Sequence, residues 1–210
     1  MKNFILGAGG FAKEVALLFE NSVFSNSKLD GFIDSEPKTE FILIKGRKIR
    51  VITEESFFTD NSETDVNLFL GTGDPNINKK LISKYSSYNF PNLIDSRSQI
   101  NLNYNKIGVG NIFTAGVIMT IDIELGSYNI LNLNSTIGHD SKIGSFNVIN
   151  PGCNISGGVG IGDLNLLGTN STILQNIVIG SNNVLGAGSV LIKNILNNET
   201  HVGVPNKRIK

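Results

Sequence analysis

From residue 107 onward, a large apolar residue recurs at every sixth position. The series holds fifteen residues, and none of them is polar or charged. Its members are Ile107, Phe113, Met119, Leu125, Leu131, Ile137, Ile143, Ile149, Ile155, Ile161, Leu167, Ile173, Ile179, Leu185 and Leu191. A regular repeat predicts a stacked architecture in which each unit buries its apolar residue against its neighbours. We expect each hexapeptide to form one short strand that adds one large side chain to a common core.

A longer period of 18 residues is superimposed on the hexapeptides. An aliphatic residue followed by glycine recurs at positions 107, 125, 143, 161 and 179. Three hexapeptides per coil predict a parallel β-helix with a triangular cross-section, whose coils stack about 4.8 Å apart. Five asparagines share the period and are expected to stack as a ladder of amide hydrogen bonds. They are Asn111, Asn129, Asn147, Asn165 and Asn183.

A second column of the repeat marks a corner of the predicted prism. Glycine and asparagine alternate there, and both tolerate the positive φ that a sharp corner requires. The column is Gly116, Asn134, Gly152, Asn170 and Gly188. The small residues that follow it are expected to point inward: Val117, Ser135, Cys153, Ser171 and Ser189. Cys153, the single cysteine, is therefore interpreted as a small core residue and not as a nucleophile.

The first ninety residues have a different pattern, in which apolar strands alternate with helices. One strand runs into the glycine turn Gly7–Ala12, of the form G-x-G-x-x-A, and an amphipathic helix follows. A second strand ends at Asp34 and a third at Gly71 and Gly73. This predicts a small Rossmann-like α/β domain whose turn offers backbone N–H groups to a phosphate. With about three strand–helix units, it suits a mononucleotide or nucleotide sugar better than NAD. A glycine turn without a ligand is the third interpretation.

Composition narrows the classes of function. Lys plus Arg and Asp plus Glu both number 18, so the net charge is zero and the basic footprint of a nucleic-acid-binding protein is missing. One cysteine excludes a disulfide within the chain and argues against a cysteine-based zinc site. No apolar run approaches the roughly 18 residues of a membrane span. We therefore expect a soluble, cytoplasmic protein without a membrane segment or a resident metal.

Five segments carry a resemblance to a known family. They are GAGGFAKEV, GFIDS, LGTGD and FPNLI before the predicted β-helix, and VGVPNKRI after it. In this order they resemble the hexapeptide-repeat acyltransferases that N-acetylate nucleotide-linked amino sugars, and the closely related sialic acid O-acetyltransferases. The resemblance implies a left-handed β-helix and a homotrimer with active sites between prisms. It sets a Rossmann-like nucleotide-sugar-binding domain at 1–92, a β-helix acetyltransferase domain at 93–198 and a tail at 199–210.

The resemblance assigns the nucleotide of the sugar substrate to the N-terminal domain. By motif match, the residues expected to hold it are Gly9, Gly10, Phe11, Asp34, Ser35 and Gly73. UDP is slightly favoured over GDP or dTDP. Many relatives carry histidine where this chain has Phe11, so contacts to phosphate in the first loop are expected from backbone N–H groups.

His139 lies two residues after core position Ile137, so its side chain is expected to point outward at an edge of the prism. Taken alone, such a histidine is usually only a solvated side chain. In the segment IGHDS, the resemblance makes His139 the general base and the following acidic residue, Asp140, the group that tunes it. An amine that attacks a thioester directly must lose a proton, and imidazole suits this near neutral pH. A direct contact between the two side chains requires a turn at 138–140, which Gly138 permits; otherwise Asp140 acts across the subunit interface.

The resemblance places the co-substrate, acetyl-CoA, in the groove between two prisms. The segments LLGTNS and VLGAGSVL point to Thr169 and Ala187. The basic tail brings Lys207 and Arg208 toward the CoA phosphates, unless it is simply a solvated terminus. The other histidine, His201, is expected at the surface.

The function expected is therefore N-acetylation of the 4-amino group of a nucleotide-linked 4-amino-4,6-dideoxy sugar, in glycan biosynthesis. The alternative on the same scaffold is an O-acetyltransferase of sialic acid or a related sugar. A non-enzymatic nucleotide-sugar-binding protein is less favoured. A metal-dependent β-helix lyase of the carbonic anhydrase kind needs three histidines per metal, and this chain has two in all.

Overall fold

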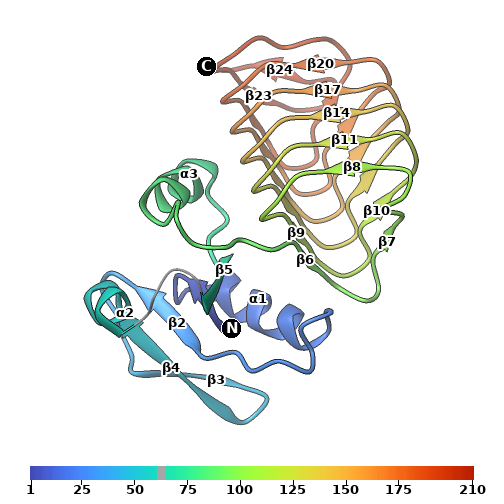
Figure 1. The fold of residues 1–210 in the computed structure, drawn as a ribbon. Coiled ribbons are helices and arrows are strands. Elements are labelled where there is room, and N and C mark those ends of the chain that lie inside the picture. The colour runs from blue at the N-terminus through green and yellow to red at the C-terminus, as the bar shows by residue number, and fades with distance from the viewer. Residues whose placement is uncertain (61–64) are drawn as a thin grey trace. The chain divides into compact units, whose positions relative to one another are not determined.

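The protein forms two compact units, each with the architecture that its sequence pattern predicts. The computed structural model describes residues 1–60 and 65–210. The first unit comprises residues 1–73 with 77–96, and the second comprises residues 74–76 with 97–210. Figure 1 follows the chain from the α/β unit, in blue to green, into the stacked coils, which run from green through yellow to red.

The first unit is built on a five-stranded sheet in the order β3-β4-β2-β1-β5. All neighbours pair in parallel except β3 and β4. The strands are β1 (Lys2–Leu6), β2 (Gly31–Asp34), β3 (Phe41–Ile44), β4 (Arg47–Thr53) and β5 (Val66–Leu70), and the short β6 (Leu93–Ile94) follows later in the chain. The helices are α1 (Gly10–Glu20), α2 (Glu54–Asp60) and α3 (Pro75–Lys84). Because β1 lies between β2 and β5, the loops after these strands meet at the carboxyl edge, where open parallel sheets bind ligands.

The hairpin of β3 and β4 at the sheet edge is an element that the sequence analysis did not anticipate. Its two-residue loop, Lys45 and Gly46, has positive φ at both positions, 45° and 78°. That is the type I′ geometry whose twist matches two antiparallel strands. The alternating burial of Phe41–Ile44 fits an edge strand with one face toward the core.

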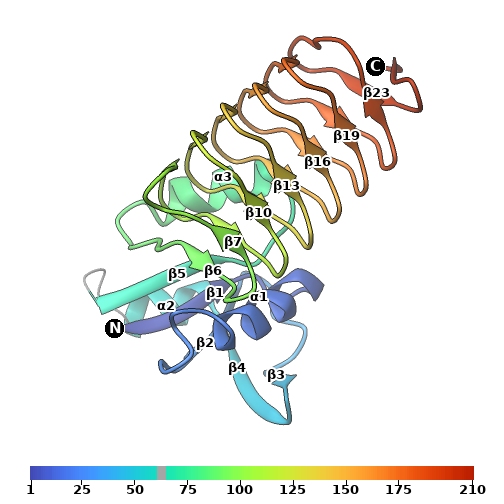
Figure 2. The ribbon, with the colours of Figure 1, turned by 90° about the vertical axis from the view of Figure 1, so that its right-hand side faces the viewer.

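The second unit is a prism with three sheets as its faces, seen along one side in Figure 2, and its strands pair in parallel except for β23 with β24. The first face holds β9 (Ile112–Phe113), β12 (Ile130–Leu131), β15 (Val148–Ile149), β18 (Leu166–Leu167), β21 (Val184–Leu185), β23 (Thr200–Val202) and β24 (Lys207–Arg208). The second holds β7 (Gln99–Ile100), β10 (Ile118–Met119), β13 (Thr136–Ile137), β16 (Asn154–Ile155), β19 (Thr172–Ile173) and β22 (Val190–Leu191). The third holds β8 (Lys106–Ile107), β11 (Glu124–Leu125), β14 (Lys142–Ile143), β17 (Gly160–Ile161) and β20 (Val178–Ile179).

The register of the coils confirms the 18-residue period. Leu131 pairs with Ile149, for example, and each further coil repeats this offset. Fourteen of the fifteen apolar positions are buried, and only Ile107, in the first coil, is half-buried. The small column that contains Cys153 is also buried, as expected. Each hexapeptide thus contributes one large side chain to the axis of the prism.

Two ladders of side-chain hydrogen bonds hold successive coils at their spacing. In the asparagine ladder, Asn147 donates from its backbone N–H and its side-chain amide to Oδ1 of Asn129, and the neighbouring rungs repeat the backbone bond. In a second ladder, outside the first, the backbone N–H of Ser127 donates to Ser145 Oγ, and that of Ser145 to Asp163 Oδ1. In the first ladder each backbone N–H donates to the preceding coil, and in the second ladder each donates to the following coil. Together they fix the backbone on both sides of one corner.

We name the corners by the face that precedes them. The first corner follows the first face (residues 114–117, 132–135, 150–153, 168–171 and 186–189), the second corner follows the second face (120–123, 138–141, 156–159 and 174–177), and the third corner follows the third face (108–111, 126–129, 144–147, 162–165 and 180–183). At the first corner all five glycines and asparagines of the predicted column have positive φ, between 54° and 75°. A Cβ added to Gly116 would lie 2.0 Å from Oδ1 of Asn134, and one added to Gly152 would lie 2.1 Å from Oδ1 of Asn170, so these two glycines leave room for the next asparagine. This explains why the two residue types alternate.

Candidate functional site

His139 lies at the second corner, directly after β13. Its side chain is 66% exposed, which confirms that it points outward from an edge of the prism. His139 Nδ1 lies 2.7 Å from Oδ2 of Asp140, whose side chain is 67% exposed. The direct contact that the sequence left open is therefore formed within one chain.

The turn that joins these side chains is made by Asp140 itself. Asp140 has a φ of 60°, and aspartate is among the residues that tolerate this left-handed conformation. Gly138 contributes differently: a Cβ there would lie 2.6 Å from the backbone nitrogen of Gly157. Gly138 is thus needed for coil stacking, while the reversal at Asp140 turns its carboxylate back to the imidazole.

Gly157, one coil beyond His139, is a contact that the sequence analysis missed. A Cβ added to Gly157 would lie 2.6 Å from His139 Nε2 and 2.7 Å from Cε1. The imidazole therefore has its Nδ1 side against Asp140 and its Nε2 side over the glycine. The 18-residue separation of His139 and Gly157 is the sequence signal that predicts this contact, because residues one period apart stack in adjacent coils.

The first unit brings the predicted nucleotide-binding segments together at the carboxyl edge of its sheet. The backbone N–H of Ala8, in the glycine turn, donates to Asp34 Oδ2 at 3.0 Å. A Cβ on Gly7 would lie 3.4 Å from Thr72 Cγ2, so the turn after β1 also adjoins the loop after β5. Asn78 of α3 is fully buried and holds that loop through hydrogen bonds to the backbone oxygen and the hydroxyl of Thr72.

The glycines at this edge fall into two groups. A Cβ on Gly71 would lie 2.6 Å from both Ile5 and the backbone oxygen of Leu6, so this glycine is required by packing. For Gly9, Gly10 and Gly73, no heavy atom lies within 4 Å of an added Cβ, and none of the three has positive φ. The fold itself does not require glycine at these three positions. They leave an open space beside the first turn of α1, whose N-cap has no side-chain hydrogen bond.

The other predicted nucleotide-binding residues differ in their burial and in the hydrogen bonds that they form within the protein. Asp34 accepts hydrogen bonds from the backbone N–H groups of Ala8 and Glu36, so its carboxylate organises the glycine turn. Ser35 is exposed and Phe11 is half-buried. Asp34 thus stabilises the edge on which Ser35 and Phe11 are presented.

The predicted acetyl-CoA residues lie at a different corner from His139. Thr169 and Ala187 are exposed residues of the first corner, in the coils that follow Gly157. The chain order of the faces separates this corner from the second corner, which carries His139. One chain therefore does not assemble both sets of residues at one edge.

The C-terminal residues fold onto the last coil instead of extending from it. β23 pairs in parallel with β21, and β24 turns back antiparallel to β23. The prediction that His201 lies at the surface is wrong: it is 7% exposed, with Nε2 3.0 Å from Glu199 Oε2 and Nδ1 2.8 Å from Asn206 Nδ2. Lys207 and Arg208 are both exposed, and Arg208 also forms an ion pair with Glu199 at 2.9 Å.

Cys153 is chemically inert at neutral pH. Its side chain is fully buried, and burial raises the pKa of the thiol to about 12. Its Sγ lies 3.2 Å from Ser171 Oγ, the next residue of the inward column. A thiol that stays protonated is a poor nucleophile.

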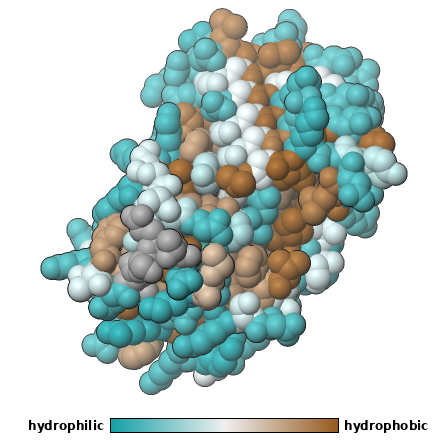
Figure 3. All heavy atoms as spheres, viewed as in Figure 1, coloured by the Kyte–Doolittle hydropathy of each residue, from teal (hydrophilic) through white to brown (hydrophobic). Residues whose placement is uncertain are grey.

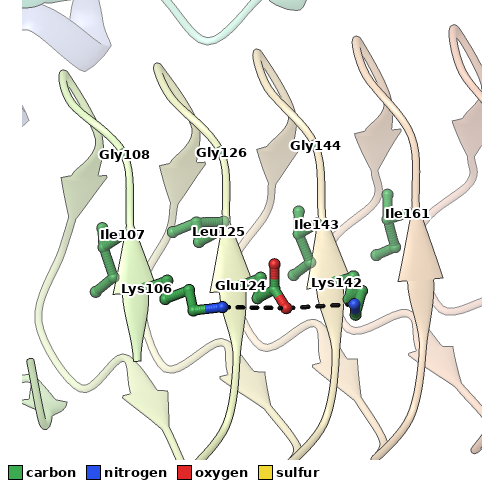
Figure 4. Close-up of a pocket in the computed structure, with 10 residues that line it drawn as sticks. All are labelled: Lys106, Ile107, Gly108, Glu124, Leu125, Gly126, Lys142, Ile143, Gly144 and Ile161. Carbon is green, nitrogen blue, oxygen red and sulfur yellow. Dashed lines mark ion pairs between the residues drawn. The ribbon is translucent and has the colours of Figure 1, made fainter. Parts of the chain in front are cut away.

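A groove of about 530 Å³ runs along the third face, and its lining residues do not include His139. Figure 4 shows its ionic row, in which Glu124 lies between Lys106 and Lys142 on adjacent coils, with N–O distances of 3.7 and 3.2 Å. These lysines, Lys142 first, hold the pKa of the Glu124 carboxyl below its usual value. In Figure 3 pale and brown residues form a band along the prism with hydrophilic margins. These ion pairs connect successive coils. They contain no histidine, unlike the pair of His139 and Asp140.

Two further findings apply to residues 1–60 and 65–210. No helix in these ranges is long and apolar enough to cross a bilayer. Nor do the same residues contain a group of three or more His, Cys, Asp and Glu side chains that could hold a metal ion.

The chain is similar to known proteins in its sequence and in its fold. The family model described as the PglD N-terminal domain matches residues 2–85. No curated protein sequence matches the chain.

Solved structures match the fold of the whole chain. A perosamine N-acetyltransferase from Caulobacter crescentus, with one histidine replaced and in complex with CoA and GDP-perosamine, is 23% identical, with a TM-score of 0.90 over 100% of this chain and 97% of that chain. The acetyltransferase domain of PglB from Neisseria gonorrhoeae, in complex with acetyl coenzyme A, is 24% identical, with a TM-score of 0.88 over 99% and 98%. WeeI from Acinetobacter baumannii is 23% identical, with a TM-score of 0.86 over 100% of both chains.

The resemblance drawn from the sequence motifs is thus confirmed by the match of residues 2–85 to this family model and by the fold that the whole chain shares with these structures. The predicted fold class, a Rossmann-like α/β domain followed by a left-handed parallel β-helix, is confirmed as well.

Proposed function

We propose that the protein is an acetyl-CoA-dependent N-acetyltransferase that acts on the 4-amino group of a nucleotide-linked 4-amino-4,6-dideoxy sugar. The observation that carries this proposal is the exposed pair of His139 and Asp140, 2.7 Å apart at a corner of the β-helix. The family of residues 2–85 and the fold shared with a perosamine N-acetyltransferase support it.

The contact with Asp140 prepares His139 to act as a base. When the carboxylate accepts a hydrogen bond from Nδ1–H, the neutral imidazole keeps its lone pair on Nε2. As the amine nitrogen attacks the thioester carbonyl carbon, Nε2 takes the amine proton and the C–S bond then breaks. The proton passes to the departing CoA thiolate, and no covalent enzyme intermediate is needed.

The carboxyl edge of the first unit is suited to the nucleotide part of the substrate. Gly9 and Gly10 leave room at the first turn of α1, where free backbone N–H groups favour a diphosphate. Gly73, Ser35 and Phe11 border the same edge, and Asp34 holds the turn in place. Glycine at positions that need none for folding supports a ligand that approaches the backbone closely.

Acetyl-CoA is assigned to a groove between two copies of the chain, in a homotrimer. Because Thr169 and Ala187 lie at the first corner and His139 at the second, a neighbouring prism is needed to bring a first corner to the base. Lys207 and, less freely, Arg208 are the cations assigned to the CoA phosphates.

A panel of acceptors tests the proposal. Purified protein is incubated with acetyl-CoA and, in turn, UDP-, GDP- and dTDP-linked 4-amino-4,6-dideoxy sugars, and both thiol release and product mass are measured. One or more of these sugars should gain a single acetyl group on nitrogen. Sialic acid is the matched control, and acetylation of its hydroxyl with none of the amines acetylated would favour the O-acetyltransferase. Tight binding of a nucleotide sugar without any turnover would contradict enzymatic activity.

A further inference from the structure

The imidazole of His139 is held from two sides. On one side, Nδ1 contacts the carboxylate of Asp140 at 2.7 Å. On the other side, the ring lies over the backbone of Gly157 in the next coil, where an added Cβ would be 2.6 Å from Nε2, 2.7 Å from Cε1 and 3.0 Å from Cδ2. The atom assigned to accept the proton is therefore the one closest to the missing side chain.

Backbone conformation does not explain the glycine at position 157. Its φ lies outside the left-handed region, so an alanine there meets no backbone strain. The three heavy atoms nearest to the added Cβ all belong to the ring of His139. Gly138 and Gly168 differ, since the atoms nearest to their added Cβ belong to the backbone of the next coil. Those two glycines let coils stack, whereas Gly157 makes room for one side chain.

We infer that Gly157 is a positioning residue, which fixes the place of His139 Nε2 by leaving free the volume that a side chain would fill. This inference rests on the proposed function, because it concerns the base of that reaction. Optimal contact between non-bonded heavy atoms is about 3.5–4.0 Å, so a methyl group at 157 must displace the ring by about 1 Å. The ring is exposed and moves without disturbing the coils. A misplacement of about 1 Å in a reacting group is enough for a loss of about a hundredfold in rate.

The test compares Gly157→Ala with Gly160→Ala, a matched control in the same coil. An added Cβ on Gly160 would lie 3.8 Å from Val178 Cγ2, which is an ordinary contact, and Gly160 also lacks positive φ. For Gly157→Ala we expect an unchanged thermal midpoint, a kcat lower by about a hundredfold and a KM within about twofold of the wild type. Gly160→Ala should match the wild type in all three. A normal kcat in Gly157→Ala would overturn the inference.

Imidazole NMR gives a readout that does not depend on turnover. The chain has two histidines, and the buried His201 serves as an internal reference. In Gly157→Ala the ring nitrogen resonances of His139 should move while those of His201 stay fixed. Unchanged His139 resonances would overturn the inference even if activity fell. If the wild type acetylates no amino sugar, the proposed function fails, and the resonances still decide whether Gly157 places the ring.

A double variant separates the ring from the backbone of Gly157. If the glycine acts only through His139, adding Gly157→Ala to His139→Ala should leave the residual rate unchanged. A further loss of the same size as in the wild-type background would show that Gly157 acts by another route, and would overturn the inference.

Discussion

Glycines serve opposite purposes in the two units of this protein. In the β-helix, an added Cβ on Gly126 or Gly168 would lie 2.5 to 2.7 Å from atoms of the next coil, so these glycines allow the coils to stack. At the carboxyl edge of the α/β unit, the space around Gly9, Gly10 and Gly73 is empty to 4 Å. The contrast shows that the role of a glycine can be inferred from the atoms that a side chain at its position would contact. Neighbouring backbone indicates a glycine that folding requires, and open space at the ends of parallel strands is consistent with a ligand that approaches the backbone.

The glycines that allow the coils to stack predict the largest effect, which is a loss of stability. In Gly168→Ala, the new Cβ would lie 2.5 Å from the backbone nitrogen of Ala187 and 2.6 Å from the backbone oxygen of Leu185. Since backbone cannot move aside as a side chain does, we expect a loss of about 3 kcal/mol in the free energy of unfolding. Denaturant unfolding at fixed protein concentration measures it, with Gly160→Ala as the control. Equal stability of the two variants would break the distinction.

The open glycines at the strand ends of the α/β unit predict a smaller effect, which concerns ligand binding instead of folding. Gly73→Ala should leave the free energy of unfolding within about 0.5 kcal/mol of the wild type, because the added methyl group meets no protein atom. Affinity for the nucleotide sugar should fall by about tenfold, equivalent to about 1.4 kcal/mol. Calorimetric titration and thermal unfolding of the same samples provide both values. Full affinity in this variant would remove the reason given for the open glycine.

At the corner that carries the base, Asp140→Asn should lower kcat by about fivefold, less than the loss of the base itself. Asparagine keeps the positive φ of this position, so the turn is preserved. The variant loses the carboxylate that accepts a hydrogen bond from Nδ1–H and so keeps the lone pair on Nε2. Steady-state kinetics with the amino sugar measures the change, and a kcat equal to that of the wild type would contradict the role of Asp140.

The smallest effect is expected at the C-terminal cap of the prism. A hydrogen bond with His201, together with the N–H of Leu196 and the charge of Arg208, holds the pKa of the Glu199 carboxyl below its usual value. The stability that this supplies is present above the ordinary glutamate pKa of about 4.3 and is lost as the pH falls through the lower pKa of the folded state. Stability should thus fall less steeply below about pH 4.3 in Glu199→Gln than in the wild type. Parallel pH curves would refute the assignment.

The sequence was sufficient to predict the architecture and the location of His139. The 18-residue period predicted the register, the asparagine ladder and the positive φ of the first corner, because each depends on one residue type at one repeated position. The motif match also grouped Asp34 with the glycine turn, and the backbone N–H of Ala8 in that turn donates to the Asp34 carboxylate.

Other features depend on contacts that the sequence does not display. Tyr128, Phe146 and Leu164 have φ values of 61° to 62° at the third corner, where bulky residues are disfavoured. The two flanking ladders impose this conformation, and the rings of Tyr128 and Phe146 stack with centroids 5.1 Å apart. His201 was misplaced because its burial results from the chain turning back at β24, which no repeat position predicts.

The most direct test of the central claim, that His139 is the base of an acetyl transfer, is the turnover of His139→Asn with a nucleotide-linked amino sugar and acetyl-CoA. We predict a kcat lower by at least about a hundredfold, with the thermal midpoint and the affinity for the nucleotide sugar both unchanged. A variant that folds, binds and still turns over within about fivefold of the wild type would contradict the claim.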